Sequence, residues 1–259
     1  MKELVLLTGA SSGIGLEMAK ILAQQRLDLI LVARREDKLM ALKNELEQAH
    51  GVKVHVFAKD LSRVENTAAL YPEVKAAGLE VTMLVNNAGF GGYGAFERTP
   101  LEQELEMITV NISSMVILTK LFLQDMKARN TGKIMNIGSI LSFFPFPYYA
   151  VYAATKAFVL SFSESLEAEL ADTNITVVTL CPGPTDTPFN TPEMWKTNAY
   201  KANKPMPPTV IAKKAVEALL KGKGTIVVGV QNQLITSAPR FTPRRLMVKI
   251  TKHLASYTS

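Results

Sequence analysis

The sequence predicts an α/β fold, a doubly wound sheet of seven parallel strands with helices on both faces. Short apolar segments alternate with longer segments of helical periodicity along the whole chain. Several of the short segments are apolar at consecutive positions, as strands buried on both faces are. The expected strand order is 3-2-1-4-5-6-7 with right-handed crossovers. The seven expected strands are residues 4–7, 29–32, 52–57, 81–85, 133–137, 175–180 and 226–230.

Length and composition favour one domain with a large core. The chain has 259 residues, of which 47% are apolar. We expect a main domain over residues 1–235, with a basic amphipathic extension over residues 236–259. The single cysteine, Cys181, excludes an intramolecular disulfide, and the three scattered histidines have no metal-ligand spacing, so no metal site is expected. The sequence has no recognisable signal peptide and no uncharged apolar run of 18 residues, which favours a cytoplasmic protein.

The first strand is followed by a turn that could bind phosphate. Glycines in this turn permit a tight bend and let the backbone approach a pyrophosphate at the start of the first helix. The alternative is a merely tight strand–helix turn. The cofactor-binding candidates here are Thr8, Gly9, Ser11, Ser12, Gly13, Ile14 and Gly15.

The second strand ends in Arg34 and Arg35, where an enzyme selecting NAD usually has an acidic residue. A guanidinium would instead pair with a 2′-phosphate, which favours NADP(H) over NAD(H). The alternative is a solvated basic pair at the start of a helix.

Two further strand ends carry polar candidates. Asp60 and Leu61 follow the third strand, and Asp60 could accept a hydrogen bond from an adenine amino group or cap a helix beginning at Ser62. The fourth strand ends in Asn86, followed by the candidates Asn87, Ala88 and Gly89, which could line the ligand site or form a plain turn.

Two long helices are expected over residues 101–127 and 149–170. Asn111 lies inside the first, where asparagine is unfavourable because it competes for backbone hydrogen bonds. It indicates either a kink or a polar group directed at the site. Both helices are apolar on one face and could pair with a second copy, giving a homodimer or homotetramer.

Tyr152 and Lys156 are the strongest catalytic candidates. Their spacing places a phenol and an ammonium on one helical face. A neighbouring positive charge lowers the pKa of a tyrosine and so makes it a better general acid or base near neutral pH. Ser139 follows the fifth strand and can reach the same site. Taken alone, the tyrosine–lysine spacing is weak evidence, because a surface pair has the same pattern.

The sixth strand leads into a candidate nicotinamide-binding turn and a long apolar segment. The turn contributes Pro182, Gly183, Thr185 and Thr187. The segment 188–208 holds five prolines and several large apolar residues without clear secondary structure, which favours a lid over an apolar substrate. A loop packed on the body is the alternative. Residues 143–146 would line the opposite wall.

The C-terminal segment carries most of the net charge of +6. From residue 240 onward there are five basic residues and no acidic one, so the rest of the chain is nearly neutral and offers no nucleic-acid face. Thr242 and Pro243 would open an amphipathic helix as its N-cap and first residue. Such a helix could lie on an anionic membrane, pack on a partner subunit or cover the lid.

Together these motifs resemble the short-chain dehydrogenase/reductase family, which has a Rossmann fold. The resemblance spans residues 3–230 and rests on the glycine turn, the segment Asn86–Gly89, and Asn111, Ser139, Tyr152, Lys156 and Pro182-Gly183. It implies that Tyr152 is the general acid or base and that Lys156 lowers its pKa and binds the nicotinamide ribose. It further implies that Ser139 binds the substrate oxygen and that Asn111 kinks its helix and holds a water of a proton relay.

The resemblance also assigns Gly9, Gly13 and Gly15 to the cofactor turn, Asp60 to adenine and Asn87 to the adenosine side. Tyr148 and Tyr149 lack a lysine four residues later and are not expected to be the catalytic tyrosine. The expected activity is NADP(H)-dependent, reversible carbonyl reduction or alcohol oxidation on an apolar substrate. A non-catalytic NADP(H) sensor and a membrane-surface interaction protein are the alternatives.

Overall fold

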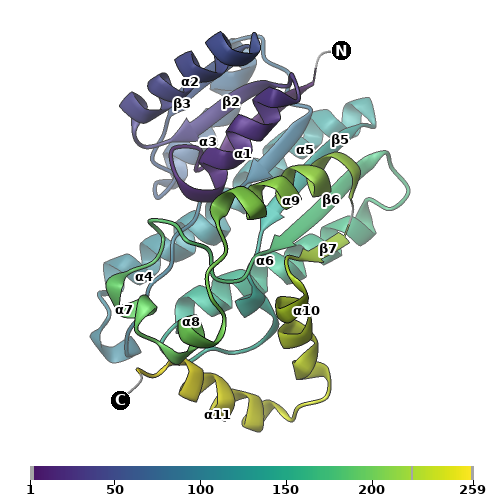
Figure 1. The fold of residues 1–259 in the computed structure, drawn as a ribbon. Helices are drawn as coiled ribbons and strands as arrows, with labels where there is room; N and C mark the ends of the chain where they lie inside the picture. Colours follow the sequence, from purple (N-terminus) through teal and green to yellow (C-terminus); the bar gives the residue numbers. More distant parts are fainter. Residues whose placement is uncertain (1–2, 223, 258–259) are drawn as a thin grey trace.

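A computed structural model describes residues 3–222 and 224–257, and it contains the expected seven-stranded parallel sheet (Figure 1). The sheet order is β3-β2-β1-β4-β5-β6-β7, and every pairing between neighbouring strands is parallel. The strands are β1 (Leu4–Thr8), β2 (Asp28–Ala33), β3 (Val54–Ala58), β4 (Met83–Asn86), β5 (Gly132–Ile137), β6 (Ile175–Cys181) and β7 (Gly224–Val227). The predicted fold class is confirmed.

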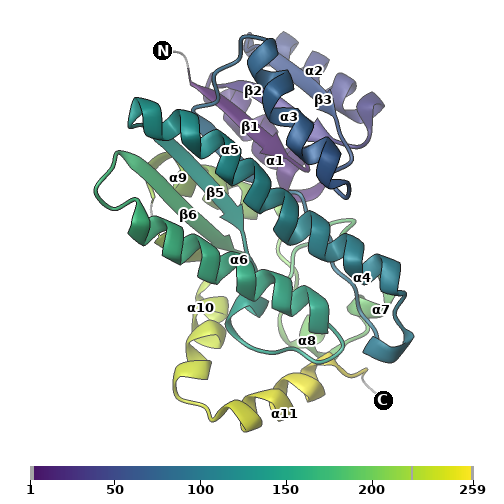
Figure 2. The same cartoon turned by 180° about the vertical axis from the view of Figure 1, so that it is seen from behind.

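Helices cover both faces of the sheet, as the consecutive apolar residues in the strands require (Figures 1 and 2). One core lies beneath α1 (Gly13–Gln24), α2 (Glu36–His50) and α9 (Pro208–Lys221). The second core lies beneath α3 (Val64–Ala76), α5 (Ser114–Arg129) and α6 (Ala150–Glu169). All residues of β1 and β2 are buried between the two layers.

The long helix around Asn111 is present, and it is interrupted where the sequence predicted. It consists of α4 (Leu101–Ile108), a π-helical turn (Thr109–Ser113) and α5. Such π turns occur where a residue is inserted into a helix, often at functional sites. Within the described residues, Leu101–Arg129 is the one helix whose length and apolar composition would allow a membrane span. Core helices pass the same test, and here α5 packs on α3, β4 and β5.

The segment after β6 is more ordered than predicted. The lid, residues 188–208, contains two short helices, α7 (Pro192–Trp195) and α8 (Asn198–Ala202), so the expectation of no secondary structure was wrong. Thr191 accepts a hydrogen bond from the backbone of Met194, and Pro192 occupies the first helical position, which together start α7.

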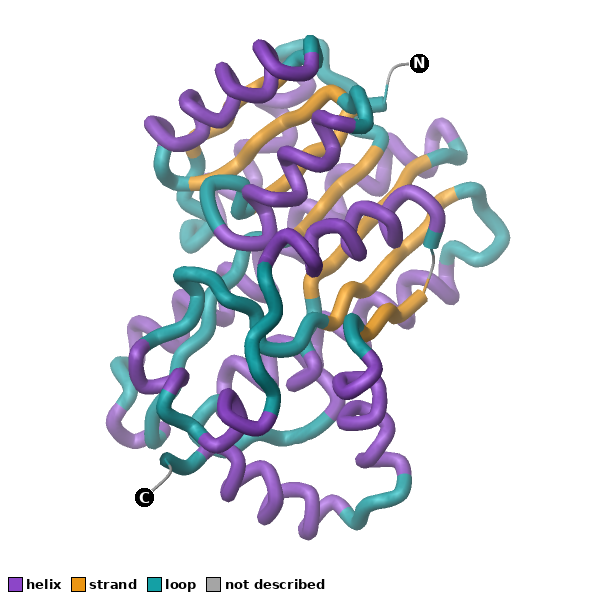
Figure 3. Tube along the Cα trace, viewed as in Figure 1, coloured by secondary structure: helices purple, strands orange, loops and turns teal. Residues whose placement is uncertain are grey.

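The C-terminal segment, which in the structure begins with Val230, forms two helices at the end of the molecule opposite β3 (Figures 1 and 3). The seventh strand ends at Val227 rather than at Val230, because Gly229 (φ 94°) turns the chain into α10 (Val230–Ser237). The proposed domain boundary after residue 235 therefore falls inside a helix. The last helix, α11 (Arg244–Ala255), begins one residue after Pro243, so the prediction that Thr242 caps it was wrong.

Four short turns complete the described structure. They are the 3₁₀ segments η1 (Phe96–Arg98), η3 (Ile140–Phe143) and η4 (Ala238–Arg240), and the π turn η2 (Thr109–Ser113). A third apolar cluster joins residues from η3, α6, the lid and α11, and it lies beyond the carboxyl ends of the strands.

Candidate active site

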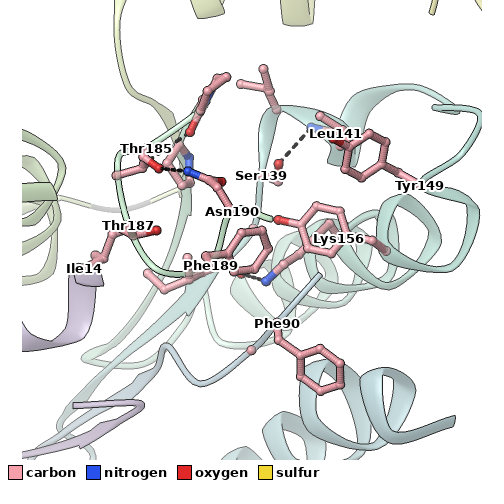
Figure 4. A pocket seen from close by; sticks show the side chains of 18 of the residues that line it. Ile14, Phe90, Ser139, Leu141, Tyr149, Lys156, Thr185, Thr187, Phe189 and Asn190 are labelled. Carbon is pink, nitrogen blue, oxygen red and sulfur yellow. Dashed lines mark hydrogen bonds between the residues drawn. The ribbon is translucent and has the colours of Figure 1, made fainter. Parts of the chain in front are cut away.

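A cavity of about 850 Å³ lies at the carboxyl ends of the central strands. This is the edge at which doubly wound sheets bind ligands. Figure 4 shows side chains from the segment after β5, from α6, from the turn after β6 and from the lid around one space. Of the candidates predicted from the sequence, all except Thr8, Gly15 and Asn111 line this cavity. The tube trace in Figure 3 shows loops gathered at this end of the strands.

The glycine turn is built for close backbone approach. The backbone of Gly9 has a φ of 68° and that of Gly13 a φ of 56°, a region that favours glycine. A Cβ atom at Gly9 would lie 2.8 Å from the side-chain amide nitrogen of Asn87. The backbone N–H of Gly9 also donates to the Val32 carbonyl at 2.8 Å, which holds the turn after β1 against the end of β2.

Thr8 and Asn87 position this turn. The Thr8 hydroxyl accepts hydrogen bonds from the backbones of Asn87 at 3.0 Å and Ala88 at 2.9 Å. The side-chain amide of Asn87 donates to the Thr8 carbonyl at 2.9 Å. Thr8 is buried and does not line the cavity, so its role here is to hold β1 and β4 in register at the site.

The end of the cavity beside the glycine turn carries positive charge from Arg34 and Arg35. Arg35 donates to the carbonyl and hydroxyl oxygens of Ser11, at 3.3 and 3.0 Å, and so lies over the glycine turn. Arg34 is largely exposed and lies 3.6 Å from Glu106. Asp60 accepts from both the backbone and the hydroxyl of Ser62, and it lines the cavity beside Leu61.

Asp60 is ionised at this position. Burial raises the pKa of its carboxyl, but hydrogen bonds from Ser62 and the charge of Arg34 outweigh this and lower the pKa below the usual value. The expected helix start at Ser62 was wrong, since α3 begins at Val64, and Asp60 closes the turn before that helix. The capping role of Asp60 was therefore wrong, because Arg63 is the N-cap of α3, whereas its place on the cavity wall is compatible with a contact to adenine.

Ser139, Tyr152 and Lys156 line the opposite side of the cavity, where Figure 4 labels Ser139 and Lys156. The Lys156 Nζ lies 5.8 Å from the centre of the Tyr152 ring and donates to the Ile137 carbonyl at 2.7 Å. The Ser139 hydroxyl lies near enough to Tyr152 to lower the pKa of that phenol, and it accepts from the backbone of Leu141 at 3.1 Å. The sequence-based expectation that these three residues share one site is confirmed.

The pKa of Tyr152 differs from the expectation. Burial raises the pKa of Tyr152 to about 12, and the hydrogen bond from Ser139 lowers it only in part. The predicted lowering of this pKa by Lys156 is therefore absent from this structure. Burial also lowers the pKa of Lys156 to about 8, because the ammonium has lost its water and no acidic group pairs with it.

Asn111 lies outside the cavity and connects two of the segments that line it. Its side-chain oxygen accepts from the backbone of Phe90 at 3.1 Å, while its amide donates to the Phe90 carbonyl and the Thr155 hydroxyl, both at 3.0 Å. The residue thus clamps the segment after β4 against α6. It does not line the cavity, and its predicted role in a proton relay stays a prediction.

The turn after β6 and the lid form the remaining side of the cavity. The Pro182 carbonyl accepts from the backbone of Ile140 at 3.0 Å, and Asn190 donates to the Thr185 carbonyl at 2.6 Å. Phe189 lies with its ring centre 5.5 Å from that of Tyr152. Residues of the segment 188–208 thus line the cavity beside Tyr152, and their function as a lid stays a prediction.

Beyond Tyr152 the cavity becomes a largely apolar chamber. Its walls come from η3, α6, the lid, α10 and α11, and the C-terminal segment is therefore part of the site. Sequence reasoning missed several of these lining residues because no local motif marks them. They include Phe90, Tyr149, Asn190, Tyr200, Met247 and Leu254.

The residues present fit a dinucleotide cofactor. The glycine cradle lies at the N-terminus of α1, two arginines stand at the end of β2, and Lys156 lies at the opposite end of the same cavity. Gly15 packs against the carbonyl of Gly9, which brings α1 close to the turn. Within residues 3–222 and 224–257, no group of three or more His, Cys, Asp or Glu residues could hold a metal ion.

Comparison with known proteins supports the same interpretation. A family model described as short chain dehydrogenase matches residues 3–197. The chain is 35% identical over 187 residues to 17-beta-hydroxysteroid dehydrogenase type 3 of Homo sapiens, covering 70% of this chain and 59% of that protein. It is 35% identical over 211 residues to very-long-chain 3-oxoacyl-CoA reductase-A of Danio rerio, covering 79% of this chain and 63% of that protein.

The fold is similarly matched among solved structures. A short-chain dehydrogenase from Sphingobium yanoikuyae in complex with NADPH superposes with a TM-score of 0.80 at 29% identity, covering 92% of this chain and 94% of that one. In the two curated relatives the alignment spans less than two thirds of their length.

Proposed function

This chain belongs to the short-chain dehydrogenase/reductase family of oxidoreductases, and on that premise we propose that it reversibly reduces the carbonyl group of an apolar substrate with NADPH. The observation that carries the proposal is the meeting of Ser139, Tyr152 and Lys156 at the border between the cofactor cradle and the apolar chamber.

The chemistry follows from the properties of these groups. Bound NADPH would supply the hydride to the carbonyl carbon, and the protein's task is to bind, orient and protonate. Ser139 would hold the carbonyl oxygen by a hydrogen bond, and Tyr152 would give its phenolic proton to that oxygen as charge develops there. The Lys156 ammonium would stabilise the resulting phenolate until it is reprotonated. Alcohol oxidation runs through the same groups in reverse.

The preference for NADPH rests on Arg34 and Arg35. Guanidinium groups bind phosphate through charge-assisted hydrogen bonds, and an acidic partner for a ribose hydroxyl is replaced here by positive charge. Arg35 is already placed over the glycine turn by its hydrogen bonds to Ser11.

The test is oxidation of NADPH and of NADH by the purified protein with a panel of ketones, aldehydes and quinones. We expect turnover with NADPH well above that with NADH. Replacement of both Arg34 and Arg35 by Ala should raise the Kd for NADPH about tenfold or more and leave that for NADH nearly unchanged. Arg98→Ala, at an exposed site with a neighbouring Glu97, is the control. Failure to bind either nucleotide would refute the proposal.

A second role is supported by the surface of the C-terminal segment, and we propose that it docks on anionic membranes. Large apolar side chains are exposed on α10, α11 and the turn between them, and Phe241 is 87% exposed. The exposed apolar residues include Val230, Leu234, Phe241, Leu246 and Ile250. The same segment carries five basic residues, and no acidic residue follows Glu217.

The charge favours a lipid surface over a second copy of the chain. Two copies meeting symmetrically would bring the same basic residues together, whereas anionic headgroups would neutralise them. We expect co-sedimentation with phosphatidylcholine vesicles that contain phosphatidylserine, and little with phosphatidylcholine alone. The double variant Leu234→Ser, Phe241→Ser should remain in the supernatant, and Val210→Ser on α9 serves as the control. Equal pelleting of all three proteins would argue against this surface.

A further inference from the structure

Asn232 is a buried amide on α10, the helix that follows the edge strand β7 (Figure 1). Its side chain is 1% exposed and does not line the cavity. Its amide nitrogen donates to the Val228 carbonyl at 2.6 Å, and its side-chain oxygen accepts from the amide of Asn203 at 2.7 Å. These hydrogen bonds connect the chain just after β7, the helix α10 and the lid.

A backbone carbonyl fixes the orientation of both amides. The Val228 carbonyl can only accept, so Asn232 must direct its NH₂ group toward Val228 and its oxygen toward Asn203. Asn203 must then be the donor of the pair. Asn203 is the C-cap residue of α8 and lines the cavity, so Asn232 holds a residue of the cavity wall in one orientation.

Asn232 also packs directly on the turn after β6. A Cβ atom at Gly183 would collide with the side-chain amide of Asn232, at 2.7 Å from its oxygen. Gly183 does not have a positive φ, so the close approach of Asn232, and not the backbone conformation, requires glycine there. The amide therefore covers a turn that itself lines the cavity.

The same turn is joined to the end of the lid by the backbone. The N–H of Met206 donates to the Pro184 carbonyl, and the N–H of Asp186 donates to the Met206 carbonyl, both at 2.9 Å. The hydrogen bond between Asn203 and Asn232 is a second attachment, three residues earlier in the lid. Asn232 thus lies where the turn after β6, the lid and the C-terminal segment meet.

We propose that Asn232 is a positioning residue, which holds the turn after β6 and the end of the lid in the geometry that the nicotinamide half of NADP(H) requires. This inference rests on the proposed function. The arginines lie at the end of the cavity beside the glycine turn, whereas Pro182 accepts from the backbone of Ile140, next to Ser139. A dinucleotide bound at the arginines by its 2′-phosphate would bring its nicotinamide half to the turn that Asn232 covers.

Two nucleotides separate this role from a general effect on the fold. Adenosine 2′,5′-bisphosphate has the phosphorylated adenosine half of NADP⁺ and lacks the nicotinamide half. Asn232→Ala removes both hydrogen bonds and the group that covers Gly183, and it adds no atoms. We expect this variant to raise the Kd for NADP⁺ about fivefold and the Kd for the bisphosphate less than twofold. Titration calorimetry measures both values.

Kinetics give a second measurement on the same variant. At saturating NADPH and ketone, kcat should fall about tenfold, because saturation fills the site without restoring the orientation of the turn. The Kd values do not depend on turnover. A protein that shows the split between the two nucleotides but reduces no carbonyl would refute the proposed reduction and support this inference.

Thr236→Val is the matched control. Thr236 is buried on the same helix, one turn after Asn232, and its hydroxyl donates to the Asn232 and Gln233 carbonyls of that helix at 3.0 and 3.1 Å. Its loss should lower the Tm and leave both Kd values unchanged. An Asn232→Ala variant that raises both Kd values equally, or neither, would overturn the proposal.

Asn203→Ala breaks the amide pair from the side of the lid, and it tests the proposal even where Asn232→Ala does not fold. It should also raise the Kd for NADP⁺ and not that for the bisphosphate. The double variant Asn203→Ala, Asn232→Ala should bind NADP⁺ nearly as Asn232→Ala does, because both substitutions remove the same hydrogen bond. Effects of the two substitutions that multiply would mean that the residues act separately and would overturn the proposal.

Discussion

At the scale of single residues, Lys156 is a buried ammonium whose charged form is destabilised by the fold. The ammonium is 6% exposed and has the Ile137 carbonyl as its hydrogen-bond acceptor, without an acidic partner. Burial of a lysine in this way lowers its pKa and destabilises the charged form. Strongly shifted pKa values are characteristic of functional sites, where groups needed for chemistry reduce the stability of the fold.

Removing that charge should stabilise the protein while stopping the reaction. The pKa of Lys156 falls from an ordinary 10.5 to about 8, so the unfolded chain binds more protons than the folded one between those values. Stability from this group therefore rises with pH across that window. Lys156→Met should be more stable than the wild type at pH 7 by roughly 3 kcal/mol or less, at about 1.4 kcal/mol for each pKa unit.

Urea unfolding at pH 7 and pH 10 measures this effect. The advantage of the variant should shrink as the pH rises, whereas Lys127→Met, at an exposed site on α5, should show no such trend. A variant less stable than the wild type at both pH values would mean that the ammonium contributes favourably to the fold.

Tyr152→Phe should abolish turnover and leave NADPH binding largely intact. The substitution removes the proton donor and retains the ring that packs against Phe189. Loss of a general acid typically lowers kcat by about 10²–10⁴-fold. Stopped-flow measurement of NADPH oxidation with a saturating ketone, together with titration of NADPH, distinguishes the two effects. A near-normal rate would exclude Tyr152 as the acid.

The motif residues could be predicted from the sequence because each follows a strand or lies at a helical spacing. The cavity is lined, as expected, by Ser139 after β5 and by Tyr152 and Lys156 on α6. It is also lined by Gly9 and Gly13 of the turn after β1. The pKa of Tyr152 could not be predicted in the same way. It depends on how much water the lid and the chamber wall exclude, and that is a property of the assembled protein.

At the scale of elements, the lid forms one wall of the cavity beside Tyr152. Its residue Phe189 lies against Tyr152 and close to Gly91, where a Cβ atom would be 2.6 Å from the ring. The lid helices α7 and α8 escaped prediction because each is shorter than two turns, too short for a periodic pattern. They are held by tertiary contacts, such as the hydrogen bond from the backbone of Asn198 to the Ser256 carbonyl.

Phe189→Ala should weaken the binding of long apolar ketones. The ring contributes apolar contact area beside the reacting carbonyl, and its removal should raise KM about tenfold for these ketones. Short ketones, which do not reach the ring's far side, should change less. Steady-state kinetics with a series of chain lengths checks this, with Phe96→Ala on the exposed η1 turn as the control. Equal effects on short and long ketones would speak against a lid function.

At the scale of the whole molecule, apolar side chains remain exposed on two neighbouring helices. Leu101 and Leu105 on α4 are 64% and 53% exposed, and Phe158 on α6 is 40% exposed and stacks on Phe162. The two helices contact each other within the chain. Exposed apolar residues that cluster in this way indicate a protein interface.

We expect a homodimer or homotetramer formed through this surface. The double variant Leu105→Lys, Phe158→Lys should shift the protein to monomers in size-exclusion chromatography with light scattering, because it places like charges in a symmetric contact. Val210→Lys, which changes an exposed apolar residue on α9, should not. A wild type that is monomeric at micromolar concentration would refute the expectation.

The fold itself was predictable because the alternation of strands and helices leaves little choice of topology. The contribution of the C-terminal segment to the site was not. No motif links Tyr93 to Ala255, yet the hydroxyl of the first donates to the carbonyl of the second across 162 residues of sequence. Only packing reveals that α11 forms a wall of the chamber.

This wall has a consequence for the order in which the protein is made. The glycine turn and the arginines of the cofactor cradle lie within the first 35 residues, whereas Met247 and Leu254 come after the last strand. On the ribosome, the strands that carry the cradle emerge long before the helix that closes the chamber. A nascent chain can thus acquire its nucleotide site while the substrate site is still open to solvent. The chamber wall is completed by residues that are synthesised after all seven strands.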